Sequence, residues 1–156
     1  MKTFRLSTLL LMPLALFVVT IVPAQAQNWS AEEQEILDFT EACWETFAEE
    51  DVVKYLSECA HDDYTRWTSG ASMPFDSGHE RAMLPPWFSR NDWVAWDIQP
   101  HRIKVSGEAA VIQYQFVNYR SSTEGSTWWV SGGRSDFLVR EGGVWKIFGA
   151  HEHASE

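Results

Sequence analysis

The chain has 156 residues, of which 45% are hydrophobic and 14% are aromatic, and its formal net charge is −10. This composition can supply the core of one compact domain, and the length is too short for two. Because nucleic acids and anionic membrane surfaces are bound through Lys and Arg, the acidic balance argues against nucleic acid and membrane as partners of the mature protein.

Residues 1–26 have the pattern of a cleaved signal peptide. Two basic residues precede an apolar run from Leu9 to Val22, and Ala24-Gln25-Ala26 forms a small-x-small cleavage site. A membrane anchor is the less favoured alternative, because the run is short for a bilayer span of ~20 residues. We therefore expect an exported protein, periplasmic or extracellular, whose folded domain covers 27–156.

The first segment of this domain is predicted to form two helices. Ser30 and Glu33 form a capping box, and apolar side chains then recur at helical spacing, which predicts a helix over about 31–48. After a polar break at 49–51, the apolar spacing resumes and predicts a shorter helix over 52–60. The residues that define the two apolar faces are Ile36, Leu37, Phe39, Cys43, Trp44 and Phe47, and then Val52, Val53, Leu56, Cys59 and Ala60.

Cys43 and Cys59 are the only cysteines, and each lies eight residues from Asp51. An antiparallel pair of helices would therefore place the two sulfur atoms at a similar height. Outside the reducing cytosol such a pair can form a disulfide. Two buried free thiols are the alternative, because thiols behave as small hydrophobes, and the spacing leaves the choice open.

The middle of the chain combines a short strand with a variable segment. Tyr64 to Trp67 is a strand candidate, and Ser69 to Gly78 is rich in Ser, Gly and Pro, which is typical of a loop. Glu80 to Phe88 can hold one or two helical turns. Pro85-Pro86 should end or kink these turns, because proline lacks the backbone donor and clashes with the preceding turn. We expect this region to form a rim.

From residue 93 onward the pattern predicts antiparallel strands joined by tight turns. Glu141-Gly142-Gly143 tolerates positive φ at a reversal, and Gly132-Gly133 predicts a bulge that bends the sheet. Helices followed by such strands indicate an α+β domain with its helices on one face of a curved sheet. The predicted strands are Trp93 to Ser106 with a break at Pro100, Ala109 to Arg120, Trp128 to Arg140, and Val144 to His153.

The end of the chain carries a sequence motif that is similar to the motif of a known protein family. Gly133-Arg134-Ser135-Asp136 is followed by Arg140-Glu141-Gly142-Gly143-Val144-Trp145-Lys146-Ile147 and then by His151. With the preceding helix pair and strand, this motif resembles the SnoaL-like branch of the nuclear transport factor 2-like superfamily over nearly all of the predicted domain. Ser135, where threonine is common, and His153, where a small polar residue is common, depart from that pattern.

The resemblance implies a cystatin-like cone, in which N-terminal helices pack in the concave face of a curved mixed or antiparallel sheet. Alternate strand residues would line a pocket inside the cone. Such folds host isomerases, dehydratases, cyclases and hydrolases, and also modules that only bind or oligomerise. The fold therefore leaves the function open.

Side chains alternate along a strand, so one face of the strand 109–120 should line this pocket. The even-numbered face alternates apolar and hydrogen-bonding groups and has the parity that the resemblance implies, so we assign this face to the pocket. Arg134 and Asp136 share one face of the next strand and are expected to point into the same cavity. The predicted ligand-binding residues are Tyr64, Trp67, Trp87, Phe116, Asn118 and Arg134.

Asp136 and Tyr114 are candidates for proton-transfer chemistry. A carboxylate in an aromatic cavity loses hydration and takes up a proton more readily, and a tyrosine hydroxyl can hydrogen-bond a developing enolate. His79 in the rim is a third catalytic candidate, because a mobile imidazole can cover a ligand and carry protons; a solvated loop histidine is the alternative. Arg134 on the face of Asp136 favours a structural ion pair instead.

No metal or cofactor is expected. His151 and His153 are expected on one strand face with Trp145 and Ile147, with Glu152 on the opposite face, but no carboxylate joins the two histidines at a recognisable spacing. The chain also lacks a glycine-rich phosphate loop, a P-loop and a nucleophile elbow.

The chain contains nine tryptophans. Trp128-Trp129 places one ring on each face of a strand, so one indole should lie outside the core. Aromatic residues are common in binding cavities and in subunit contacts, and the resemblance implies dimerisation through the outer sheet face. We therefore predict a homodimer; carbohydrate stacking on exposed tryptophan is an alternative.

Two functions compete. The first is an exported SnoaL-like domain whose aromatic pocket binds a small, largely apolar molecule. The second is a cofactor-free lyase or isomerase, ketosteroid-isomerase-like or dehydratase-like, that uses Asp136 with Tyr114. Catalysis would require these two side chains to converge on one void with Arg134 turned away.

Overall fold

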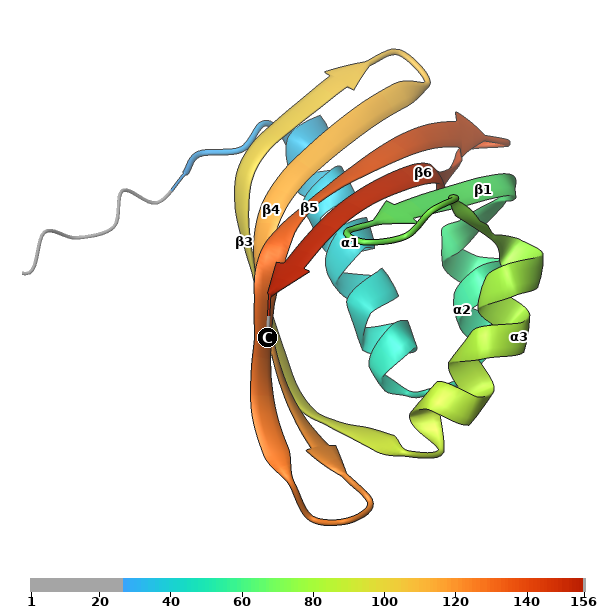
Figure 1. Ribbon diagram of the computed structural model, residues 1–156. Helices are drawn as coiled ribbons and strands as arrows, with labels where there is room; N and C mark the ends of the chain where they lie inside the picture. The colour runs from blue at the N-terminus through green and yellow to red at the C-terminus, as the bar shows by residue number, and fades with distance from the viewer. Residues whose placement is uncertain (1–26, 156) are drawn as a thin grey trace, which may run out of the picture.

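The computed structural model describes residues 27–155, which form three helices and one six-stranded sheet (Figure 1). The predicted signal peptide, residues 1–26, lies outside the described residues. In chain order the elements are α1 (Ala31–Ala48), α2 (Val52–Cys59), β1 (Ala60–Thr68), β2 (Phe75–Asp76), α3 (Ser77–Phe88), β3 (Asn91–Ser106), β4 (Ala109–Ser122), β5 (Thr127–Glu141) and β6 (Val144–Ser155).

Helix α1 has the predicted bounds, and its first turn contains the predicted capping box. The Ser30 hydroxyl accepts a hydrogen bond from the backbone N–H of Glu33 at 3.2 Å, and the Glu33 carboxylate accepts one from the N–H of Ser30 at 3.0 Å. Both bonds satisfy donors that the start of a helix leaves unpaired. The inner face of the helix is buried, with Ile36 at 0% and Trp44 at 8% exposure.

A disulfide between Cys43 and Cys59 joins α1 to α2. The Asp51 side chain caps α2 by accepting a hydrogen bond from the backbone N–H of Lys54 at 3.0 Å. The turn between the helices brings the two cysteine Cα atoms to 5.7 Å, within the range that a disulfide spans. Of the two alternatives that the spacing left open, the structure has the disulfide.

Helix α3 is longer than predicted and continues through both prolines. It begins in the segment predicted as a loop, where the Asp76 side chain accepts a hydrogen bond from the backbone N–H of His79 at 2.7 Å. Pro85 and Pro86 are exposed, so the carbonyl groups that lose a helical donor lie on the solvent side of the helix, where water can replace it. The prolines do not end the helix, because α3 continues to Phe88, the predicted last residue; the alternative that they kink it stays a prediction.

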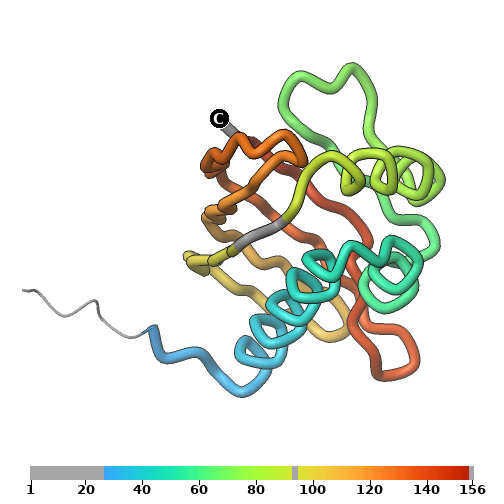
Figure 2. Tube along the Cα trace, turned by 90° about the horizontal axis from the view of Figure 1, so that it is seen from below, coloured from blue at the N-terminus to red at the C-terminus, as the bar shows by residue number. Residues whose placement is uncertain are grey.

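The sheet is mixed, with the strand order β2-β1-β6-β5-β4-β3. Strands β3 to β6 form the predicted antiparallel meander, whereas β1 pairs with β6 in parallel. The long strands curl around α1, and the three helices lie on the concave side, as Figure 1 and the view from below in Figure 2 show. The predicted α+β cone is confirmed.

A bulge in β6 changes which side chains face the interior. Leu138 pairs with Ile147, but the preceding residue, Phe137, pairs with Gly149, so Phe148 is an extra residue on β6. An extra residue exchanges the two faces of a strand for everything that follows it.

The face exchange corrects the predicted orientation of the last strand. Before the bulge, Trp145 and Ile147 are buried. After the bulge, His151 and His153 are exposed and Glu152 faces inward with only 17% of its side chain exposed. The prediction that the two histidines share the face of Trp145 and Ile147 was therefore wrong.

Gly132 is required by a close approach of neighbouring strands. Strand β5 pairs without a register shift through Gly132 and Gly133, so the bulge predicted there is absent. A Cβ atom at position 132 would overlap the carbonyl oxygen of His153 and lie 2.9 Å from the Cα of Ala154 and from the ring of Phe116. A Cβ at position 133 would meet no atom within 4 Å.

We expect Gly132→Ala to lower the free energy of unfolding by about 3 kcal/mol, at the upper end of the usual cost of overpacking, because backbone atoms must move. Gly133→Ala is the matched control and should be neutral or should stabilise by up to ~1 kcal/mol, because glycine in a strand carries an entropic cost. Denaturant unfolding of both variants measures the difference. Equal midpoints would contradict the close approach at position 132.

Two clusters of buried apolar residues fill the cone. One lies between α1 and strands β3 to β5 and includes Trp44, Tyr114 and Phe116. The other lies among α2, α3, β1 and β6 and includes Tyr55 and Ile147. Both sets border one cavity, which therefore lies where the two clusters meet.

Candidate functional site

A cavity of about 50 Å³, here called the deep chamber, lies between α1 and the concave face of the sheet. A wider hollow of about 230 Å³ lies beside it, against α3, and is called the mouth. Four residues line both spaces: Phe47, Arg66, Arg120 and Glu152. The deep chamber and the mouth are therefore adjoining parts of one site, at the junction of α1, α3, β1, β4 and β6.

The structure brings five of the predicted site residues into the wall of the deep chamber. Tyr114, Phe116 and Asn118 reach it from alternate positions of β4, and Arg134 and Asp136 reach it from β5. Tyr114, Phe116, Asn118 and Asp136 are each at most 2% exposed. The predicted inward face of both strands is thus present, because β4 and β5 pair without a register shift over this stretch.

The other four predicted residues lie elsewhere. Trp87 lines the mouth. Tyr64 is buried in the cluster near α2 and is not among the residues that line either space. Trp67 is 44% exposed. It lies three positions from Tyr64 on the same strand, so its side chain points to the opposite face of the sheet. His79 is exposed and stacks on Phe75, with ring centroids 4.2 Å apart.

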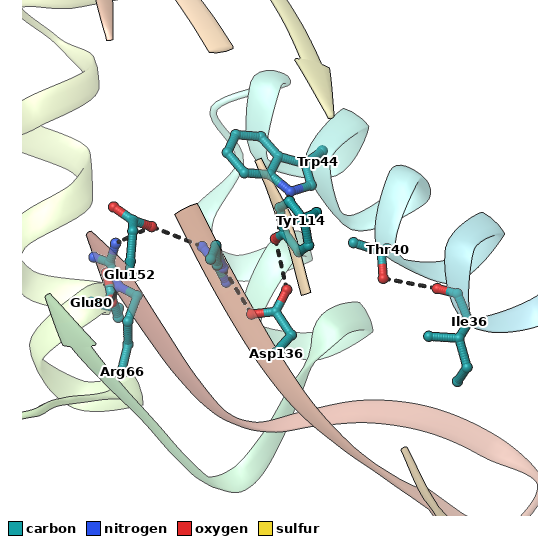
Figure 3. A network of polar contacts seen from close by, with 9 residues as sticks. Ile36, Thr40, Trp44, Arg66, Glu80, Tyr114, Asp136 and Glu152 are labelled. Atoms are coloured by element: carbon teal, nitrogen blue, oxygen red, sulfur yellow. Dashed lines mark hydrogen bonds and ion pairs between the residues drawn. The ribbon is translucent and has the colours of Figure 1, made fainter. Parts of the chain in front are cut away.

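A chain of ion pairs crosses the wall of the site (Figure 3). Arg66 contacts Glu80 at 2.7 Å and Glu152 at 3.5 Å. Arg134 contacts the same Glu152 oxygen at 3.2 Å and Asp136 at 2.8 Å. We call these five residues the carboxylate–arginine chain. Its members come from α3, β1, β6 and β5, so it joins the two sides of the cone.

Asp136 has a donor on each carboxylate oxygen. Arg134 Nε donates to Oδ1 at 2.8 Å, and the Tyr114 hydroxyl donates to Oδ2 at 2.7 Å. Trp44 Nε1 in turn donates to the Tyr114 oxygen at 3.0 Å. This arrangement holds Asp136 as an acceptor inside a buried network, which is the structural pairing favoured from the sequence.

Burial and neighbouring charges raise the pKa values of Tyr114 and Arg134. Burial raises the pKa of Tyr114 well above its ordinary value; Arg134 lowers it and Asp136 raises it further. Burial alone would lower the pKa of Arg134, but Asp136 and the nearby tyrosines outweigh this effect and raise it. Tyr114 therefore stays a hydroxyl donor and Arg134 stays a cation at physiological pH.

Sequence reasoning missed three members of the carboxylate–arginine chain: Arg66, Glu80 and Glu152. Glu80 is 1% exposed on α3, one position after the exposed His79 that was predicted instead. Asp76 was the available signal for the start of α3, because an N-cap at that position begins the helix at Ser77 and places Glu80 within its first turn.

Two residues that line the deep chamber each have a buried oxygen atom without a hydrogen-bond partner. The atoms are Glu80 Oε2 and Asn118 Oδ1, and both residues are 1% exposed. Buried polar atoms of folded proteins almost always have a partner, because an unsatisfied acceptor carries its full desolvation cost. Each of the two atoms can therefore still accept a hydrogen bond.

Within residues 27–155, no group of three or more His, Cys, Asp or Glu side chains has the arrangement of a metal site. The two histidines considered for a metal, His151 and His153, are exposed, and His153 pairs with the Ser69 hydroxyl at 2.6 Å. The expectation that no metal or cofactor takes part stays a prediction.

Several aromatic side chains lie on the outer face of the sheet. Trp129 is 61% exposed and packs against Tyr119 with the ring centroids 4.6 Å apart. Phe137 and Phe148 are 50% and 45% exposed. Of the tryptophan pair, Trp128 packs against the core, so the two rings lie on opposite faces as predicted. The homodimer predicted through this face stays a prediction.

No helix among the described residues is long and apolar enough to cross a membrane.

The sequence matches no family model and no curated protein, but solved structures match most of the chain. A conserved protein from Planctomyces limnophilus has a TM-score of 0.74 at 17% identity, over 80% of this chain and 97% of that one. A nuclear transport factor 2-like protein from Cytophaga hutchinsonii has a TM-score of 0.68 at 15% identity, over 81% and 100%. This chain has the nuclear transport factor 2-like fold.

A ketosteroid isomerase-like protein from Erwinia carotovora atroseptica has the same fold, with a TM-score of 0.69 at 11% identity over 82% of this chain and 99% of that one. Identities this low establish a shared nuclear transport factor 2-like fold and leave chemistry open. The fold family predicted from the terminal motif is confirmed, whereas its SnoaL-like branch stays a prediction.

Proposed function

We propose that this chain is a small-molecule binding domain of the nuclear transport factor 2-like fold, with its ligand in the deep chamber and the mouth. One observation carries the proposal: charged residues buried to 1–17% exposure surround a space that the two apolar clusters leave open. Buried ion pairs add little net stability compared with apolar packing. A wall of this kind around an open chamber is therefore better explained by a bound ligand than by folding.

The two parts of the site differ in character. The deep chamber is polar at its wall, whereas Phe47, Met83, Leu84 and Trp87 give the mouth an apolar side. Ligand sites commonly combine such apolar walls with a few fixed polar groups. The proposed ligand is accordingly a small molecule whose apolar body lies in the mouth and whose polar head reaches the chamber.

The cellular location belongs to the same proposal. The signal-peptide pattern of residues 1–26 and the Cys43–Cys59 disulfide both fit an exported protein, because disulfides persist in oxidising compartments. An exported binding domain would meet its ligand outside the cytosol.

Catalysis by Asp136 and Tyr114 has less support. A general base needs a lone pair that faces the substrate, and an enolate-stabilising hydroxyl needs a proton to donate to it. Here Asp136 accepts bonds from Arg134 and Tyr114, and the Tyr114 proton is directed to Asp136. Arg134 is not turned away, as catalysis would require. The lyase or isomerase function stays a prediction.

The binding function can be tested by screening a fragment library against the purified protein. The readout is the NMR signals of the tryptophan indole N–H groups. Trp87 lines the mouth, whereas Trp129 is exposed on the opposite face of the sheet and serves as an internal control. We expect binding fragments to shift the Trp87 signal and leave the Trp129 signal unchanged. Single Trp→Phe variants assign the two signals. A library that shifts Trp129 alone, or neither signal, contradicts the proposal.

A further inference from the structure

We propose that the head group of the ligand is a primary ammonium, held by Glu80 and Asn118 in the deep chamber. This inference rests on the proposed binding function and specifies the class of ligand: a small organic amine with an apolar body.

The unpartnered atoms determine the direction of the missing hydrogen bonds. Glu80 Oε1 already accepts from Arg66, while Oε2 has no partner, and Asn118 Oδ1 has none either. Both atoms are acceptors, so the missing groups are donors. An ammonium carries three N–H donors and no acceptor and can donate to more than one oxygen, whereas a hydroxyl has a single donor.

The preference for a cation over a neutral donor comes from Glu80, because the atom without a partner is a carboxylate oxygen. The ionised side chains of the chamber wall balance in number: the carboxylates of Glu80, Glu152 and Asp136 stand against the guanidinium groups of Arg66, Arg134 and Arg120. Arg120 lines both the chamber and the mouth and lies over the Trp87 ring at 4.8 Å. A hydrogen bond from an ammonium to a carboxylate is charge-assisted and about twice as strong as a neutral one.

The size of the two spaces fits this division of the ligand. The deep chamber of about 50 Å³ admits a head group of a few heavy atoms, and the mouth of about 230 Å³ admits a body such as one phenyl ring. The net charge of −10 also favours the approach of a cationic ligand from solution.

Three probes with the same phenylethyl body test the assignment: phenethylamine, 2-phenylethanol and 3-phenylpropionate. Calorimetry should give the tightest binding for the amine and the weakest for the carboxylate. Glu80→Gln should weaken amine binding by about 10- to 100-fold, the range for a lost bond to a charged group, and change alcohol binding little. Glu45→Gln, on the exposed face of α1, removes the same charge away from the site and is the matched control.

Asn118→Val provides a second variant, because it removes the acceptor at nearly constant volume; it should weaken amine binding by about 2- to 10-fold. The comparison of probes on the unaltered protein stands even where a variant folds poorly. Equal or tighter binding of the alcohol or the carboxylate overturns the ammonium assignment and leaves the binding function in place. If no probe binds and no library fragment shifts the Trp87 signal, both proposals fail.

Discussion

Replacing Asp136 with leucine is expected to lower the free energy of unfolding by about 3–5 kcal/mol, because it leaves Arg134 buried without its nearest counter-charge. Asp136 is 1% exposed and accepts hydrogen bonds from Arg134 and Tyr114. The substitution therefore removes the acceptor of two buried donors at once. Urea unfolding followed by circular dichroism measures the loss, and Asp62→Leu, at an exposed position on β1, is the control.

A double-mutant cycle separates the ion pair from the rest of the network. Arg134→Leu alone should cost a similar amount, because it leaves Asp136 and Glu152 without their shared partner. The double variant should cost clearly less than the sum of the single variants, since two charges that neutralise each other are removed together. Strictly additive costs would show that the 2.8 Å contact contributes nothing specific to folding.

A further variant, Asp136→Asn, distinguishes the structural role from the catalytic alternative. A structural Asp136 predicts that Asp136→Asn destabilises the protein but leaves binding of the phenylethyl probes measurable in the molecules that fold. A catalytic Asp136 would instead predict an isomerase or lyase activity in the unaltered protein that the same variant abolishes.

Features that depend on short sequence spacing could be predicted. The capping box of Ser30 and Glu33 and the apolar repeat after it determine α1 within one continuous segment. The inward face of β4 followed from strict alternation, and the alternation holds because no register shift interrupts β4 between Ala110 and Asn118. Five of the nine predicted site residues line the deep chamber for this reason.

Features that depend on one extra residue or on a distant partner could not be predicted by counting. Glu152 faces the site only because the bulge at Phe148 exchanges the faces of β6. Gly149, a glycine within a strand pattern, was the available signal for that bulge. Trp67 was a different case, because a separation of three from Tyr64 already places the two on opposite faces of a strand.

The disulfide gives the second large effect. Replacing both Cys43 and Cys59 with alanine should lower the free energy of unfolding by about 3 kcal/mol, because a cross-link over a sequence separation of 16 residues restricts the unfolded chain. For a domain of this size the melting temperature should fall by about 10 °C. Sequence spacing could not decide between a disulfide bond and two free thiols, because the distance between Cys43 and Cys59 depends on how α1 and α2 pack against each other.

The alanine variant also removes two buried sulfur atoms, so the unaltered protein under reducing conditions is the sharper control. Reduction opens the cross-link while both side chains stay in place at 4% and 2% exposure. If the bond acts by restricting the unfolded chain, the reduced protein and the alanine variant should lose most of the same stability, and protein made in a reducing cytosol should resemble both. Unchanged unfolding midpoints after verified reduction would contradict this account, and the disulfide between α1 and α2 would then add nothing to the stability of the fold.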